Sequence, residues 1–115
     1  MHYIFKVTIG AGYSAEQYAD AWMRASAYIQ RAPGALGTRL HRSLDDPDVL
    51  LAIATWESKA ARDAMEADPP AEVKAIIAEQ SPFVDIEFVG EFEAPEWAVL
   101  PEEVIAGDTG EQNLP

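Results

Sequence analysis

The chain has 115 residues, 49% of them apolar, and a net charge of −12, which suits one domain with a single core. Twenty acidic residues against eight basic ones argue against binding to nucleic-acid phosphates or anionic membranes. The absence of cysteine excludes disulfides and thiolate chemistry. No membrane span and no signal peptide are recognisable, so we expect a cytoplasmic protein.

The first elements are a strand and a helix. Residues 2–9 alternate with a period of two, which is typical of a strand, and one face carries Tyr3, Phe5, Val7 and Ile9. Ser14 with Gln17 three residues later is a capping-box pattern, and it predicts a helix that runs to about Ala32. Pro33 and Gly34 end this helix, because proline cannot continue it and glycine tolerates left-handed backbone angles.

Two strands follow, joined by an aspartate-rich turn at residues 45–48. Residues 35–43 form the first of them and place Arg39 and His41 on the face opposite Leu36 and Leu40. Residues 49–56 are nearly all apolar, which predicts a central strand buried on both faces.

The last elements are a broken helical region and a strand. Ser58 caps a helix that extends to Met65 or Ala67, and a further helix covers residues 71–80 with Val73, Ile76 and Ile77 facing inward. Residues 83–92 alternate again as a strand. The order βαββαβ predicts an α+β, ferredoxin-like fold: a four-stranded antiparallel sheet with helices on one face.

Residues 1–92 therefore form the domain, and residues 93–115 are an acidic extension with six acids and no base. Trp97, Val99, Leu100, Val104 and Ile105 make the extension too apolar for a purely solvated tail. Three interpretations stay open: a tail packed on its own domain, an arm across a second subunit, or disorder, chiefly of residues 108–115.

The predicted sheet leaves one face uncovered, and residues 49–56 leave that face apolar. A bare apolar sheet face is rare on a monomer, and a two-fold dimer that packs two sheets together would cover it. We therefore expect a homodimer.

Three stretches resemble the antibiotic biosynthesis monooxygenase family, whose members form dimeric α+β barrels. They are the turn PGALGTR at residues 33–39, DDPD at residues 45–48 and ATWESKAA at residues 54–61. The resemblance covers residues 2–92. It implies an oxygenase with no metal, flavin or other cofactor that oxidises a small aromatic phenol, anthrone or quinol with O2. The alternative is a non-catalytic dimeric module that binds a small apolar ligand.

A second branch of the family degrades heme with an asparagine on the first strand and a tryptophan and a histidine on later helices. This chain has Phe5 or Lys6 at the asparagine position, Met65 at the tryptophan position and no histidine after His41. The resemblance therefore argues against heme degradation.

Tyr18, Trp22 and Trp56 are the candidate substrate-binding residues, and packing in the core is the alternative role for each. A buried tyrosine hydroxyl needs a partner and can donate to a bound phenolate.

Arg39 and His41 are the candidate catalytic residues. Histidine titrates near neutral pH and suits a general base, and arginine stabilises an oxyanion by charge-assisted hydrogen bonds. The alternatives are a surface or interface histidine and an arginine paired with one of the many acids. No metal is expected, since His2 and His41 lie far apart and no ligand spacing surrounds them.

Overall fold

The computed structural model describes residues 1–102. Eight elements follow one another along this part of the chain: β1 (His2–Ile9), α1 (Ala15–Ile29), β2 (Ala35–Arg42), β3 (Val49–Trp56), α2 (Lys59–Ala67), α3 (Ala71–Gln80), the 3-10 turn η1 (Ser81–Phe83) and β4 (Val84–Phe92). The predicted βαββαβ order is confirmed.

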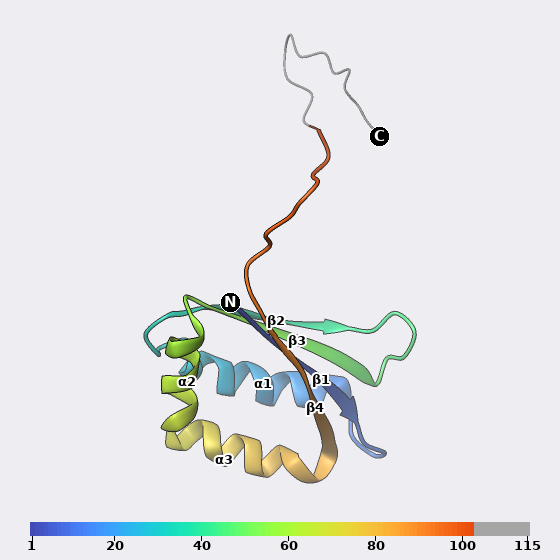
Figure 1. Cartoon of the computed structure of the whole chain (residues 1–115). Helices are drawn as coiled ribbons and strands as arrows, with labels where there is room; N and C mark the ends of the chain where they lie inside the picture. The colour runs from blue at the N-terminus through green and yellow to red at the C-terminus, as the bar shows by residue number, and fades with distance from the viewer. Residues whose placement is uncertain (103–115) are drawn as a thin grey trace.

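The four strands form one antiparallel sheet in the order β2-β3-β1-β4. The helices lie on one side of this sheet, with α1 and α3 beneath the strands and α2 at one end (Figure 1). The ferredoxin-like arrangement is thus confirmed. No helix within residues 1–102 is long and apolar enough to cross a membrane.

The core lies between α1 and the central strands. Val7, Leu50 and Ala52 are almost fully buried there, and β1 pairs with β3 through Val7 opposite Leu50 and Phe5 opposite Ala52. The alternation predicted for residues 2–9 therefore has its apolar face against the helices.

The helix boundaries follow local signals. Ser14 caps α1 with the reciprocal Gln17 bonds of a capping box, and Ser58 caps α2 through the Ala61 amide. Helix α1 ends at Ile29 rather than near Ala32, because the amides of Arg31 and Ala32 turn back to carbonyls three residues earlier. Strand β4 starts one residue later than expected, after η1.

Val73, Ile76 and Ile77 face inward from α3 as predicted, since all three line the space between the helices and the sheet, although Ile77 is 57% exposed there. One burial prediction is wrong for the single chain. Strand β3 was expected to be buried on both faces, yet Leu51 on its second face is 36% exposed. The helices cover only one side of the sheet, so the other side, which we call the open face, stays accessible.

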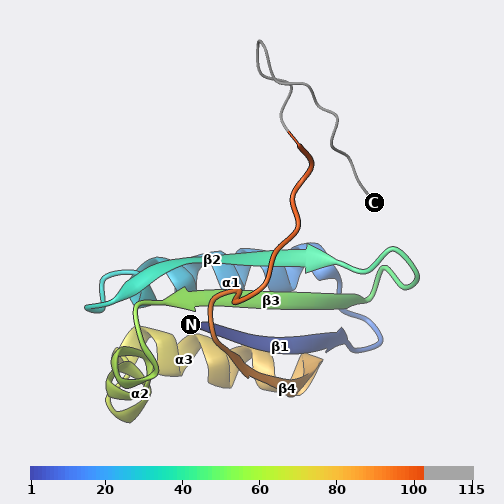
Figure 2. The ribbon, with the colours of Figure 1, turned by 45° about the horizontal axis from the view of Figure 1, so that its top comes forward.

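Residues 93–102 leave the end of β4 and run away from the sheet on the side opposite α1 and α3 (Figures 1 and 2). They form no helix or strand, and every one of them is exposed. The predictions for Val104, Ile105 and residues 108–115 lie outside the described residues.

Candidate functional site

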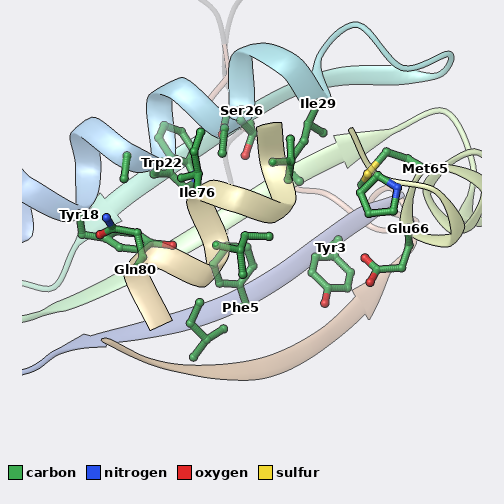
Figure 3. A pocket seen from close by; sticks show the side chains of 18 of the residues that line it. Tyr3, Phe5, Tyr18, Trp22, Ser26, Ile29, Met65, Glu66, Ile76 and Gln80 are labelled. Atoms are coloured by element: carbon green, nitrogen blue, oxygen red, sulfur yellow. The ribbon is translucent and has the colours of Figure 1, made fainter. Parts of the chain in front are cut away.

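A cavity of about 620 Å³ lies between the helices and the covered face of the sheet. Its volume falls within the range of small-molecule sites. Aromatic side chains from three elements form much of its wall: Tyr3, Phe5, Tyr18, Trp22 and Trp56. Figure 3 shows how α1, α3 and the strands enclose this space.

Tyr18 lies one turn after the capped start of α1 and is 6% exposed. Its hydroxyl has no hydrogen-bond partner among the described residues, although the side chain lines the cavity. Burial raises the pKa of Tyr18 to about 12, because desolvation disfavours the phenolate. At neutral pH this hydroxyl is therefore a protonated, unused donor next to the cavity.

Gln80 shares this end of the cavity with Tyr18 (Figure 3). The Tyr13 hydroxyl donates to its Oε1, and its Nε2 donates to Glu79 at 3.4 Å. Tyr13 is itself fixed by stacking on Phe83, with ring centroids 4.7 Å apart. The carboxamide is thus held in place by side chains outside the cavity.

Arg62 is the cationic residue of the cavity wall. Its guanidinium lies 3.8 Å from the centroid of the Tyr3 ring and donates to Glu66 at 2.8 Å. Only 15% of the side chain is exposed. Tyr3, Met65 and Glu66 lie together at the end of the cavity away from Tyr18 (Figure 3), so the two ends differ in polarity.

A second ion pair lies beside this charged end. Lys59 at the start of α2 contacts Glu91 of β4 at 3.0 Å and Asp63 at 3.3 Å. The hydrogen bond to Glu91, followed by the one to Asp63, raises the pKa of Lys59. Oε2 of Glu91 is buried and has no partner among the described residues. These contacts join α2 to the edge strand β4.

Of the predicted site residues, Tyr18, Trp22 and Trp56 line the cavity, and a substrate-binding role stays a prediction for each. Arg39 and His41 do not line it. They alternate with Thr38 along β2, and Thr38 faces the cavity. Arg39 and His41 therefore lie on the open face, on the far side of the sheet from the cavity.

Of the two first-strand residues weighed above, Phe5 lines the cavity and Lys6 does not. Met65 lines it as well. Neither side chain donates a hydrogen bond as an asparagine or a tryptophan does. Within residues 1–102, no three histidine or acidic side chains gather in a group able to hold a metal ion.

The family model for antibiotic biosynthesis monooxygenase matches residues 2–75. The chain belongs to this family. The match runs from β1 into α3, a stretch that supplies most of the cavity wall, and it ends before Gln80.

Solved structures of similar fold include other family members. The cofactor-independent oxygenase SnoaB from Streptomyces nogalater is 22% identical with a TM-score of 0.72, covering 88% of this chain and 96% of its own. A protein described as an antibiotic biosynthesis monooxygenase from Deinococcus radiodurans is 16% identical with a TM-score of 0.63, covering 86% and 100%. At these identities the likeness shows the fold alone. No curated protein matches the chain.

Sequence reasoning missed Arg62, Glu66 and Gln80 as cavity residues of this monooxygenase-family fold. Arg62 and Glu66 are spaced i, i+4 with Met65 beside them, which places all three on neighbouring positions of α2. That spacing was the available signal, but a charged pair on a short helix usually indicates a solvated face. Gln80 gave no signal, because its role depends on Tyr13, 67 residues away.

Proposed function

We propose that this protein is a cofactor-independent oxygenase that oxidises a small electron-rich phenol, anthrone or quinol with O2. The observation that carries the proposal is the aromatic-walled cavity into which Tyr18 presents an unpartnered hydroxyl donor. Membership of the monooxygenase family and a fold like that of a cofactor-independent oxygenase support it. The cytoplasmic location stays a prediction.

In the proposed reaction the substrate itself supplies the electrons. Loss of a proton to water gives an aromatic anion, which passes one electron to O2 to form superoxide and a substrate radical. These two combine to a peroxide anion, which takes up a proton to give a hydroperoxide. The hydroperoxide then breaks its O–O bond and loses water. One oxygen atom of O2 then remains in the quinone product, and the other leaves in the water.

The cavity residues have roles that fit this chemistry. The Tyr18 hydroxyl donates to the substrate oxygen and stabilises the anion, since a donor fixed away from water costs little reorganisation. Trp22 and Phe5 stack against the rings and exclude water. Arg62 adds positive charge at the other end of the cavity, where its hydrogen bond to the Glu66 carboxylate already offsets part of that charge. Arg39 and His41 have no place in this scheme within one chain.

We also propose that the working unit is a homodimer joined through the open faces. Ile4, Leu51 and Ile53 lie at the centre of the open face on adjacent strands β1 and β3, and no element of the described chain covers them. A single sheet with one bare apolar face favours self-association. Light scattering at micromolar concentration is expected to give twice the chain mass, and a monomer at that concentration would contradict this part.

Oxygen uptake tests the catalytic part. A panel of anthrone and hydroquinone is expected to consume O2 faster with the protein than in buffer, and Tyr18→Phe to lower this rate. Tyr28→Phe is the matched control, because Tyr28 lies on the same helix but outside this cavity. Binding of an anthraquinone without oxygen uptake across the panel would favour the non-catalytic binding module. A shifted Soret band on adding hemin would instead support heme binding.

A further inference from the structure

Gln80, the last residue of α3, is a buried polar side chain in the wall of the cavity. It is 7% exposed and lies at the same end of the cavity as Tyr18 (Figure 3). A carboxamide has two N–H donors and one carbonyl acceptor, and burying such a group is costly unless its hydrogen bonds are made. The partners of these groups decide whether Gln80 has a donor left for a ligand.

Two neighbours fix the orientation of the Gln80 carboxamide. Its Nε2 donates to a carboxylate oxygen of Glu79 at 3.4 Å, and its Oε1 accepts from the Tyr13 hydroxyl. Because an ionised carboxylate only accepts hydrogen bonds, the amide nitrogen faces Glu79 and the amide oxygen faces Tyr13. The Glu79 carboxylate also contacts the Arg24 guanidinium at 3.8 Å. These contacts occupy Oε1 and one of the two N–H groups of Nε2.

Tyr13 lies in the turn between β1 and α1, and the backbone fixes this turn against η1. The Gly10 amide donates to the Phe83 carbonyl at 2.8 Å, and the Tyr13 amide donates to the Gly10 carbonyl at 3.2 Å. A Cβ at Gly10 would lie 2.8 Å from the Phe83 carbonyl oxygen, so the two segments approach closely. The Tyr13 ring stacks on the Phe83 ring at an interplanar angle of 17°. The hydroxyl that holds Gln80 is therefore itself held in place.

The second N–H of Gln80 Nε2 has no partner among the described residues, and the Tyr18 hydroxyl at the same end of the cavity has none either. Asp85 also lines the cavity, but it alternates along β4 with Val84 and Ile86, which places its carboxylate on the opposite face of the strand. Two neutral donors without partners thus lie at one end of an aromatic-walled cavity.

We propose that Gln80 is a second hydrogen-bond donor to the substrate anion, beside Tyr18, and that Tyr13 is the positioning residue that keeps the Gln80 carboxamide oriented for this bond. The inference rests on the proposed function and deepens it. Fixed donors directed at one oxygen stabilise negative charge in a site that excludes water. The pair therefore selects an aromatic ring that carries an ionisable hydroxyl over a hydrocarbon of the same shape.

An isosteric substitution tests the donor. Gln80→Met keeps the length of the side chain and removes both amide N–H groups. We expect this variant to bind an anionic hydroxyanthraquinone at least about tenfold more weakly, with the affinity for anthracene nearly unchanged. The absorbance of the bound hydroxyanthraquinone gives a second readout, because the anion absorbs at longer wavelength than the neutral phenol. The ionised fraction at neutral pH is expected to fall in the variant.

Gln30→Met is the matched control for losing a glutamine from the same cavity. Gln30 also lines the cavity, but it lies 12 residues after Tyr18, about 18 Å along a helix. Its Oε1 accepts from the Gly37 amide at 2.8 Å. This variant is expected to change the affinities for hydroxyanthraquinone and anthracene by the same factor. A selective loss of hydroxyanthraquinone as large as that of Gln80→Met would refute the local donor pair.

Tyr13→Phe tests the positioning role, because it keeps the ring that stacks on Phe83 and removes only the hydroxyl bonded to Gln80. Its affinity for hydroxyanthraquinone and the ionised fraction of the bound ligand are expected to lie between those of the unmodified protein and Gln80→Met. Tyr28→Phe, which removes a tyrosine hydroxyl outside this cavity, is expected to change neither. Values for Tyr13→Phe equal to those of the unmodified protein would refute the positioning role.

Two results would overturn the role of Gln80. Unchanged affinity of Gln80→Met for hydroxyanthraquinone would show that the amide makes no bond to the anion. Equal losses for hydroxyanthraquinone and anthracene would show that the side chain only shapes the wall. Urea unfolding confirms that each variant is folded before titration. The titrations need no O2, so oxygen uptake by the unmodified protein, measured separately, distinguishes failure of the oxygenase proposal from failure of this inference.

Discussion

Replacing Tyr18 by phenylalanine separates a binding hydroxyl from a structural one. Tyr18 is only 6% exposed, and its hydroxyl has no hydrogen-bond partner among the described residues. The Tyr18 oxygen is not fully buried, because the side chain lines the cavity, and a hydroxyl without a hydrogen bond in the protein contributes little to folding. Removing it is therefore expected to leave the free energy of unfolding unchanged to within about 1 kcal/mol.

Ligand binding is expected to weaken. A hydrogen bond to a charged group contributes about 1.5–3 kcal/mol, which is about a 10- to 100-fold change in affinity. The Tyr18→Phe variant should lose this much affinity for an anionic hydroxyanthraquinone and much less for anthracene, which has no oxygen. The variant is thus expected to bind the hydroxyanthraquinone more weakly without losing folding stability. Repacking of the cavity wall would not produce this combination.

Urea unfolding and absorbance titration with the two ligands measure these effects. Tyr28 lies on the same helix but outside the cavity. Tyr28→Phe therefore shows how much the stability and the affinity change when α1 loses a tyrosine hydroxyl elsewhere. A Tyr18→Phe variant that is destabilised by more than about 1 kcal/mol and binds the hydroxyanthraquinone normally would refute the reasoning. Such a result would mean that the hydroxyl serves the fold.

Three further predictions concern pH and the backbone. Burial raises the pKa of Tyr18 from 10 to about 12 in the folded state. The protonated hydroxyl is therefore favoured by folding, and the free energy of unfolding is expected to fall by about 3 kcal/mol as the pH rises from 10 to 12. Urea unfolding of Tyr18→Phe is expected to lack this part of the alkaline loss. Gly34→Ala places a Cβ 2.6 Å from the Cβ of Ala61 at a φ of +88° and should lower the unfolding free energy more than Gly37→Ala, which shares the positive φ but meets no atom within 4 Å; equal losses by thermal unfolding would contradict the close contact. Ser14→Ala removes the capping box of α1 and is expected to cost about 1 kcal/mol in urea unfolding, and no measurable loss would mean that the cap does not hold this helix.

The sequence by itself determined the elements and their order. Alternation in residues 2–9, the Ser14 and Ser58 caps and the break at Pro33 are local signals, because they act through backbone angles and hydrogen bonds within a few residues. They sufficed for the βαββαβ order and for the set of residues that share one face of β1. They also placed Arg39 and His41 together on one face of β2.

The tertiary structure alone decided which face of each strand meets the helices and what the helices enclose. Alternation defines two faces of a strand but does not say which one is covered, and so Arg39 and His41 came to lie on the open face while Thr38 faces the cavity. Gln80 and Arg62 entered the cavity wall through contacts with Tyr13 and Tyr3, which are distant in sequence. These positions depend on how helices cross a sheet, and that crossing is set by packing over the whole domain.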